Sequence, residues 1–245
     1  MAVGPTILEG IDHGLRRGAL VEVLIGEIFR GQLRPGEHLV TRSLAERYGV
    51  SHTPIREALI SLAGVGVVDL LPNRGAIVRL VTPIEVREIG QVRRALEVEA
   101  VRGACGRIDP GVLTSLRESL LDLDRSDPTP LAERVDSARD VDSRLHDAIA
   151  AASGNAFLAR ELGRLKVLFR AFRDATWELE AIRHDPRRLR EESAEHLAIV
   201  EALLSRDCRR ASFAMSRHIL SGRRYWCRLM IGPGRPARPE GRPLA

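Results

Sequence analysis

Apolar residues recur every three or four positions along most of this chain, which is the spacing of a helix with one buried face. Near the beginning, Leu20, Leu24 and Ile28 follow this spacing. They predict a helix over 15–33, and the sequence GQLRPG ends it because glycine and proline interrupt helices. The first element of the chain is therefore expected to be an amphipathic helix.

Two shorter helical segments follow and are separated by a tight turn at Gly49 and Val50. The first is expected over 41–48 and the second from 51 onward. Pro54 is compatible with the second helix because it falls in the first turn, where a missing N–H is not needed. Two short helices joined in this way predict a helix-turn-helix.

An alternating pattern replaces the helical one after the third helix. Residues 67–71 and 76–81 predict two short strands on either side of a turn at 72–75. Two strands directly after a helix-turn-helix form a wing. The first 81 residues thus predict a winged helix-turn-helix, a module whose recognition helix is shaped to enter the major groove of DNA.

Helical spacing returns after Val81 and continues almost to the end of the chain. The expected helices cover about 83–105, 110–125, 130–152, 155–180, 186–205 and 208–229. Six helices of this length predict an all-α bundle. The chain is therefore expected to be mainly α, with a winged helix-turn-helix domain over 12–81, a helical domain over 83–230 and a disordered, Pro/Gly/Arg-rich tail over 231–245.

Composition narrows the class of protein further. The chain has 245 residues and 44% hydrophobic content, enough for two modest domains. No window approaches 18 uncharged apolar residues, so no membrane span is expected. The beginning lacks a basic segment followed by an apolar one, which favours a cytoplasmic protein. Cys105, Cys208 and Cys227 are far apart and lack metal-type spacing, so we expect incidental, reduced thiols.

Charge alone gives weak support for nucleic-acid binding. The net charge is +5, but residues 1–82 contain nine arginines against eight acidic residues. Support for DNA binding must therefore come from particular positions. The polar positions expected at the reading surface are Arg42 at the start of the first short helix, Ser51, His52, Thr53 and Arg56 at the start of the next, and Arg74 and Gly75 at the wing tip.

These positions suit contact with DNA. Arg56 lies where a recognition helix meets base edges, and an arginine there can donate two hydrogen bonds to guanine O6 and N7, worth roughly 1–3 kcal/mol of discrimination. The alternative is a solvated surface, which is the usual setting of a single arginine. The convergence of several polar groups on one module favours DNA contact.

A second set of polar residues lies in the later helices. Asp142 and His146 are four residues apart, so both lie on one side of a helix. His196 and His218 each lie 11 residues from the expected turn at Asp207. In an antiparallel hairpin they reach the same height, about 16 Å from the turn. The two imidazoles can therefore face each other, and a third helix can bring Asp142 and His146 to them.

One carboxylate and three imidazoles suit a divalent transition metal such as Zn, Ni, Mn or Fe. The same spacing is also compatible with two roles that need no metal. An Asp/His pair four residues apart is often a surface ion pair, and a histidine on a helix is often a hydrogen-bonded core residue.

The first third of the chain resembles the GntR family of bacterial transcription regulators over residues 15–81, through the sequences LRPGEHL, SLAERYGVSHTPIREAL and LAGVGVV followed by NRGAIV. The resemblance implies that the DNA contacts include Arg42, Ser51, His52, Thr53, Arg56 and Gly75. His52 departs from the family, which usually has arginine there. We therefore expect a different base preference at that step.

Residues 83–229 resemble the FCD ligand-binding domain of the FadR branch, through VRRALEVEAVRGAC, VDSRLHDAIAAASGNAFL and EHLAIVEALL followed by MSRHIL. With six helices and not seven, the domain is similar to those of the VanR-type subgroup. The resemblance implies a metal at the Asp/His positions and an arginine, Arg93 or the adjacent Arg94, that holds the carboxylate of a small organic acid. Arg93 also has an alternative role as partner of Glu97 on a solvated face. Asn155 is expected either in the cavity or as a helix cap.

Together these features predict a homodimeric transcriptional regulator, most often a repressor in this family. It would bind two-fold-related half-sites of double-stranded DNA and respond to a small carboxylic acid at the metal. An alternative keeps the regulator but makes the metal itself the signal, or only a structural ion. A more remote alternative is a metal-dependent hydrolase. The sequence shows no HExxH-like base, so no enzymatic activity is expected.

Overall fold

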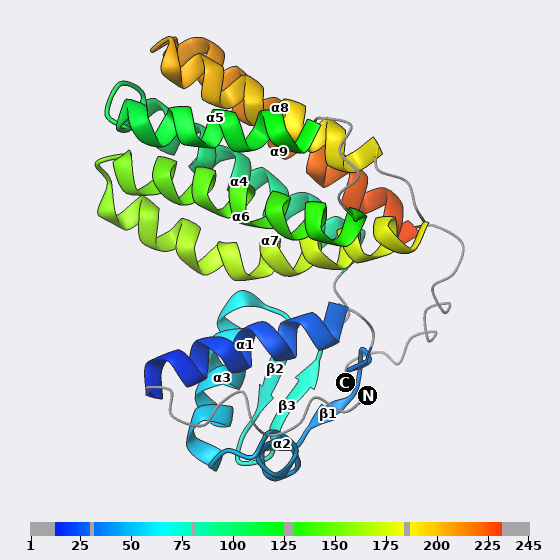
Figure 1. The fold of residues 1–245 in the computed structure, drawn as a ribbon. Helices are drawn as coiled ribbons and strands as arrows, with labels where there is room; N and C mark the ends of the chain where they lie inside the picture. Colours follow the sequence, from blue (N-terminus) through cyan, green and yellow to red (C-terminus); the bar gives the residue numbers. More distant parts are fainter. Residues whose placement is uncertain (1–12, 30–31, 80–81, 125–129, 184–186, 232–245) are drawn as a thin grey trace.

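The computed structural model describes residues 13–29, 32–79, 82–124, 130–183 and 187–231. Its fold is mainly helical, as the sequence predicts, with a small winged unit below a bundle of helices (Figure 1). Except for Ile231, the expected disordered tail lies outside the described residues. None of the helices in the described ranges is long and apolar enough to cross a membrane.

The N-terminal unit contains three helices and a three-stranded antiparallel sheet. The helices are α1 (His13–Phe29), α2 (Thr41–Tyr48) and α3 (His52–Val65), and the strands are β1 (His38–Leu39), β2 (Val68–Leu71) and β3 (Gly75–Val78). The strand order is β1-β3-β2. The sequence predicts β2 and β3 but misses β1, because two residues are too few to show alternation.

The core of this unit follows from the apolar spacing. On α3, Ile55, Leu59 and Leu62 are almost fully buried, and Leu20 and Leu24 of α1 belong to the same cluster. With this face of α3 turned inward, its first turn keeps polar side chains at the surface. The wing requires a glycine at position 75, where φ is 103° and a Cβ would lie 2.0 Å from the Leu39 carbonyl oxygen.

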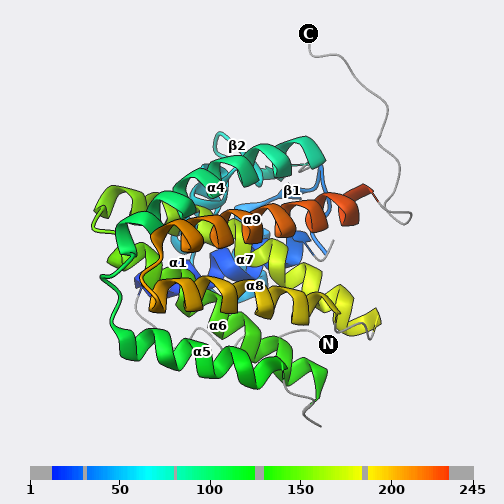
Figure 2. The same cartoon turned by 90° about the horizontal axis from the view of Figure 1, so that it is seen from above.

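The helical unit contains α4 (Pro83–Ala104), α5 (Pro110–Asp124), α6 (Leu131–Ala152), α7 (Ala156–Arg183), α8 (Arg187–Leu204) and α9 (Cys208–Ile231). Helix α4 begins with a capping box, in which Thr82 and Glu85 satisfy each other's backbone N–H groups. Seen from above, α9 lies between α4 and α8, and it packs closely against both (Figure 2). These contacts bring the inward faces of α4, α6, α8 and α9 together.

The two units meet through α7, which packs against α1 and α3 (Figure 1). Leu168 and Phe169 of α7, together with Trp226 of α9, belong to the same buried cluster as the α1 and α3 side chains. The helical bundle therefore contributes directly to the core of the winged unit.

The cysteines differ from the sequence-based expectation of incidental thiols. Cys105 and Cys208 form a disulfide bond that joins the end of α4 to the start of α9. The two residues are 103 positions apart, and only the packing of α4 against α9 brings them together. No local pattern in the sequence could reveal this pairing.

Gly103 marks a close contact between α4 and the end of α6. A Cβ there would lie 2.2 Å from the carbonyl oxygen of Ser153, a backbone atom that cannot rotate away. We expect Gly103→Ala to reduce the free energy of unfolding by about 1–3 kcal/mol, the usual cost of overpacking. Urea unfolding should measure this loss. Gly18→Ala, at an exposed helical position with nothing within 4 Å, is the matched control and should be neutral or stabilising. Equal stabilities of the two variants would contradict the expected clash.

Candidate metal centre and nucleic-acid interface

The four polar residues of the later helices converge at one buried point. Asp142 and His146 come from α6, His196 from α8 and His218 from α9, and one ligand atom from each lies within 4.8 Å of the others. The Nε2 atoms of His196 and His218 are 3.3 Å apart, as their equal spacing from Asp207 predicts. Their exposed fractions are 3% each and those of Asp142 and His146 are 8%, so Asp142 and His146 do not form a surface ion pair.

The ligand atoms lie close enough together to share one ion. Asp142 Oδ1 lies 3.4 Å from His196 Nε2 and 3.7 Å from His146 Nε2. These separations are longer than strong hydrogen bonds, and they leave space between the donors. A cluster of one carboxylate oxygen and three imidazole nitrogens is a donor set that suits a divalent transition metal.

Two further carboxylates orient the imidazoles, and sequence patterns do not reveal them in this role. Glu195 Oε2 lies 3.0 Å from His218 Nδ1, and Glu97 Oε1 lies 3.0 Å from His146 Nδ1. A carboxylate facing Nδ1 favours the proton on that nitrogen, which leaves Nε2 as a lone-pair donor. The hydrogen bond between His218 Nδ1 and Glu195 thus holds His218 with Nε2 toward the cluster, whereas Glu97 contacts His146 Nδ1 without hydrogen-bond geometry. Glu97 and Glu195 are the kind of outer partners that metal-binding histidines usually have.

The surroundings of the cluster keep His218 neutral and Glu97 ionised. Burial, and then the neighbouring His196 and His146, lower the pKa of His218 well below its usual range, so this imidazole is neutral at physiological pH. Burial alone would raise the pKa of Glu97, but the charges and contacts of His146 and Arg93 outweigh it and lower it to about 2. A neutral His218 imidazole has a lone pair to offer, which is the state that metal binding needs of a histidine ligand.

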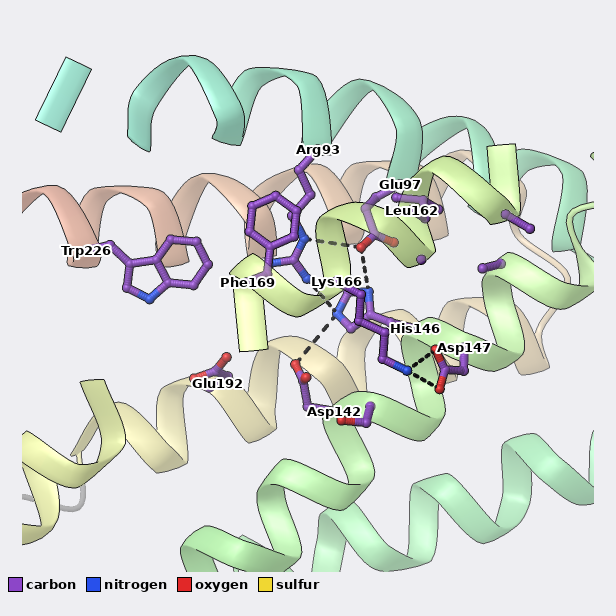
Figure 3. A pocket seen from close by; sticks show the side chains of 14 residues that line it. Arg93, Glu97, Asp142, His146, Asp147, Leu162, Lys166, Phe169, Glu192 and Trp226 are labelled. Atoms are coloured by element: carbon purple, nitrogen blue, oxygen red, sulfur yellow. Dashed lines mark hydrogen bonds and ion pairs between the residues drawn. The ribbon is translucent and has the colours of Figure 1, made fainter. Parts of the chain in front are cut away.

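A pocket of about 80 Å³ opens beside this cluster. Figure 3 shows Arg93 and Glu97 of α4 reaching toward His146 from above. Arg93 Nε donates to Glu97 Oε1 at 3.2 Å, and Arg93 Nη2 lies 3.4 Å from His146 Nε2. Arg93 is buried whereas Arg94 is exposed, which decides between the two arginines. The pairing of Arg93 with Glu97 exists, but it is buried and not on a solvated face.

The remaining walls of the pocket come mainly from α7. Lys166 forms an ion pair with Asp147 on the polar side (Figure 3). The guanidinium carbon of Arg93 lies 4.4 Å from the centroid of the Phe169 ring. Phe169 also stacks with Trp226, and their ring centroids are 6.2 Å apart. Sequence patterns do not single out these residues. The one signal they offer is that Lys166 is the sole lysine among 38 basic residues, which by itself names no role.

Asn155 lies away from this pocket. Its side chain is exposed, and Oδ1 accepts hydrogen bonds from the backbone N–H groups of Phe157 and Leu158 at 3.1 and 3.0 Å. It caps the first turn of α7, which is the second of the two roles that the sequence allows. Asn155 is not among the described residues that line the pocket, so the expectation of a cavity role is not supported.

The expected DNA-reading positions lie at the start of α2, at the start of α3 and at the turn between β2 and β3. Figure 1 shows α2 on the side of the winged unit away from the bundle. At the start of α3, Ser51, His52, Thr53 and Arg56 are exposed, whereas Pro54 and Ile55 are buried. Ser51 occupies the N-cap position without a side-chain capping hydrogen bond. Arg42 is 80% exposed and pairs with Glu46 at 2.9 Å. At the wing, Arg74 is exposed, and its backbone carbonyl oxygen lies 2.7 Å from the His38 Nε2 atom. The donors at α3 are thus available to a ligand.

Both units match known protein families. Residues 17–78 match the bacterial regulatory proteins of the gntR family, and residues 88–221 match the FCD domain, which alone covers more than half of the chain. The chain belongs to the GntR family. Its members are DNA-binding transcriptional regulators and not enzymes.

Individual relatives agree with this assignment. The uncharacterized HTH-type regulator BphR of Paraburkholderia xenovorans is 32% identical over 211 residues, covering 83% of this chain and 82% of that protein. The Escherichia coli regulator McbR is 39% identical over 90 residues, which span 37% of this chain and only 41% of McbR. A Streptomyces ambofaciens regulator is 38% identical over 96 residues, again 41% of its length. The structure of E. coli McbR/YncC superposes with a TM-score of 0.65 at 25% identity, covering 86% of this chain and 95% of that one.

The family match divides the two sets of polar residues cleanly. The GntR segment contains every expected DNA-reading position, and the FCD segment contains the Asp/His₃ cluster and Arg93. The FCD domain of this GntR chain thus holds a buried Asp/His₃ donor set that suits a divalent metal. The two candidate sites lie in separate units that meet through α7.

Removing the charge of Glu97 tests the outer partners of the metal centre. We expect Glu97→Gln to weaken Zn²⁺ or Ni²⁺ binding by about 10–100-fold, because His146 and Arg93 both lose their carboxylate. Competition against a chromophoric chelator measures this change. Glu99→Gln is the matched control, since Glu99 is an exposed glutamate on the same helix that pairs with Arg102. An unchanged affinity in Glu97→Gln would show that this carboxylate does not support the site.

Proposed function

We propose that this GntR-family chain is a homodimeric repressor of transcription whose operator binding is controlled by a small organic acid at a metal centre in the FCD domain. The observation that carries the proposal is the burial of Arg93 beside the Asp/His₃ cluster. A cationic group and a metal donor set then share one small pocket, a combination suited to a carboxylate.

The metal would be held by Asp142, His146, His196 and His218. Four protein ligands leave open positions on a metal that prefers five or six, such as Ni, Mn or Fe, and Zn can also expand its shell. A bound metal supplies a Lewis-acidic point for an anionic ligand. Without a cation, the two Nε2 atoms 3.3 Å apart bring lone pairs together unless a proton lies between them.

The acid would be held by Arg93. Its guanidinium lies 3.4 Å from His146 Nε2, so a carboxylate near the metal can also accept hydrogen bonds from it. Glu97 Oε2 is buried and has no hydrogen-bond partner among the described residues, so it can accept a bond from a hydroxyl of the ligand. A pocket of about 80 Å³ favours a small acid over a long acyl chain.

The signal would reach the winged unit through α7. Phe169 lines the pocket and packs under Arg93, and it also belongs to the cluster that contains the core side chains of α1. A ligand that shifts Phe169 or Arg93 therefore acts on the contact between α7 and α1. A change at this contact can shift the winged units of the dimer between two orientations.

The DNA partner would be a two-fold-related operator, because symmetric half-sites mirror the symmetry of a dimer. Ile84 and Val92 of α4 are 57% and 54% exposed, and they offer apolar surface for a second copy of the chain. Repression is the proposed direction because an E. coli relative that is 30% identical over 101 residues is an HTH-type transcriptional repressor, RspR. A protein that binds an operator would act in the cytoplasm.

One observation favours a second candidate, in which the metal itself is the signal or is only structural. Both cations at the pocket already have carboxylate partners, Arg93 with Glu97 and Lys166 with Asp147. The cluster therefore needs no acid to balance its charges.

Operator binding under three conditions separates these proposals. Fluorescence anisotropy with the upstream DNA of its own gene, at about 100 mM salt, would compare apo protein, metal-loaded protein, and metal-loaded protein with a panel of small carboxylic acids. We expect specific binding that at least one acid weakens only when metal is present. A response to metal alone favours the second candidate. Absence of specific binding in every condition would contradict both.

A further inference from the structure

The disulfide between Cys105 and Cys208 lies outside the metal pocket, where α4 ends and where α9 begins after its turn from α8. Cys105 follows the last residue of α4 and Cys208 is the first residue of α9. Their Cα atoms are 5.6 Å apart, a separation that allows a disulfide without movement of the backbone. The pair is thus preformed by the fold and does not need a conformational change to close.

The surroundings of Cys208 favour its thiolate. It is exposed and begins a 24-residue helix, whose N-terminal N–H groups stabilise a negative charge. Arg206, Arg209 and Arg210 are its exposed neighbours in sequence. Asp207 is the one acidic residue among these neighbours, so the three arginines outnumber its charge, and its Oδ1 accepts from the Arg210 N–H at 2.9 Å. The carbonyl oxygen of Arg206 lies 3.7 Å from Cys208 Sγ. Exposure combined with a positive surrounding is the setting of a reactive cysteine.

Cys105 has the opposite setting. It is only partly exposed and packs against the apolar core of the bundle. Burial in apolar surroundings disfavours a thiolate, so Cys105 is the less reactive of the two. An exposed attacking thiol beside a sheltered second thiol is the arrangement of a redox-active pair.

We propose that Cys105 and Cys208 form a reversible thiol–disulfide site that takes hydrogen peroxide as its oxidant. The Cys208 thiolate attacks one peroxide oxygen, the O–O bond breaks, and the departing hydroxide takes a proton to become water. This leaves a sulfenic acid on Cys208. The Cys105 thiol then attacks that sulfur, the S–O bond breaks, and a second water leaves as the disulfide forms. Two electrons pass from sulfur to peroxide, and a dithiol reverses the change by exchange.

The disulfide would act on the helices that build the metal pocket. Helix α4 carries Arg93 and Glu97, and α9 carries His218 and Trp226. Joining the end of α4 to the start of α9 fixes these helices against sliding and closes a loop of about a hundred residues in the unfolded chain. Oxidation should therefore stabilise the helical domain, raising its melting temperature by about 5–10 °C.

The test uses the full chain, reduced and then exposed to hydrogen peroxide, with intact mass and peptide mapping as readouts. We expect the loss of two hydrogen atoms and a linked Cys105–Cys208 peptide, both reversed by dithiothreitol without denaturant. Cys105→Ser should stop at a sulfenic acid on Cys208 that dimedone traps. Cys227→Ser is the matched control and should oxidise like the parent chain.

Three results would overturn the proposal. The first is that hydrogen peroxide does not change the mass of the reduced chain. The second is a dimedone adduct on Cys105 or Cys227 in place of Cys208. The third is a disulfide that dithiothreitol reduces only after unfolding, since that bond would be a permanent staple. Circular dichroism confirms that each variant is folded. None of these readouts depends on DNA or metal binding, so the outcome is independent of the proposed function.

Discussion

His196→Ala is expected to remove stoichiometric metal from the purified protein. His196 contributes an Nε2 atom that lies 3.3 Å from His218 Nε2 and 3.4 Å from Asp142 Oδ1, at the centre of the cluster. Loss of an outer partner alone costs about 10–100-fold in metal affinity, so loss of a ligand should cost more than about 100-fold. Plasma mass spectrometry of untagged protein should find about one metal per parent chain and little in the variant.

A matched control and a thermal measurement sharpen this result. His38→Ala removes an exposed histidine outside the cluster and should leave the metal content unchanged. Metal at about 1,000 times its dissociation constant stabilises a folded protein by about 4 kcal/mol, so the parent should melt higher with metal and the His196→Ala variant should not. A parent chain that stays metal-free after reconstitution would reduce the four residues to buried polar groups of the core. The sensor would then have to bind its ligand through Arg93 and hydrogen bonds.

Arg56→Ala is expected to have the largest effect on operator recognition. Arg56 is exposed on the first turns of α3, whose opposite face is buried by Ile55 and Leu59. If it contacts guanine with two hydrogen bonds, its loss should weaken specific binding by about 1–3 kcal/mol, roughly 5–150-fold, while non-specific binding changes little. Anisotropy titrations with operator and scrambled DNA measure both. Arg94→Ala, at an exposed arginine of α4, is the control.

A companion variant tests the departure of this chain from its family. His52→Arg restores the residue that the family usually has and adds a positive charge at the start of α3. We expect tighter DNA binding and a salt dependence steeper by about one unit, because one more phosphate contact releases one more counterion. Unchanged operator affinity in Arg56→Ala together with unchanged salt dependence in His52→Arg would indicate that the start of α3 does not contact DNA.

Several features of the fold follow from local sequence alone. The expected helix over 208–229 is observed as Cys208–Ile231, and the one over 41–48 as Thr41–Tyr48. Both agree closely because helical periodicity and its interruptions depend on residues only a few positions apart. β1 is the exception, since its two residues become a strand only by pairing with β3. Its presence depends on Gly75, which lets the chain pass close to Leu39.

The metal cluster follows partly from the sequence and partly from the packing of helices. The approach of His196 to His218 follows from counting residues in a hairpin, and the structure places their Nε2 atoms 3.3 Å apart. The choice between Arg93 and Arg94 cannot be made in this way. Adjacent residues point about 100° apart around a helix, so the packing of α4 against its neighbours decides which one is buried. The same packing decides that Glu97 lies beside His146.

The sequence by itself determined the family, the order of the helices and of strands β2 and β3, and the four side chains that can hold a metal, because each rests on local spacing or on a contiguous motif. Only the tertiary structure decided that Arg93 and Phe169 share a pocket, that Asn155 caps α7, and that Cys105 is bonded to Cys208. These pairings join segments up to 103 residues apart. They depend on the rotation and depth at which whole helices pack, which is set by the sum of many buried contacts and leaves no local trace in the chain.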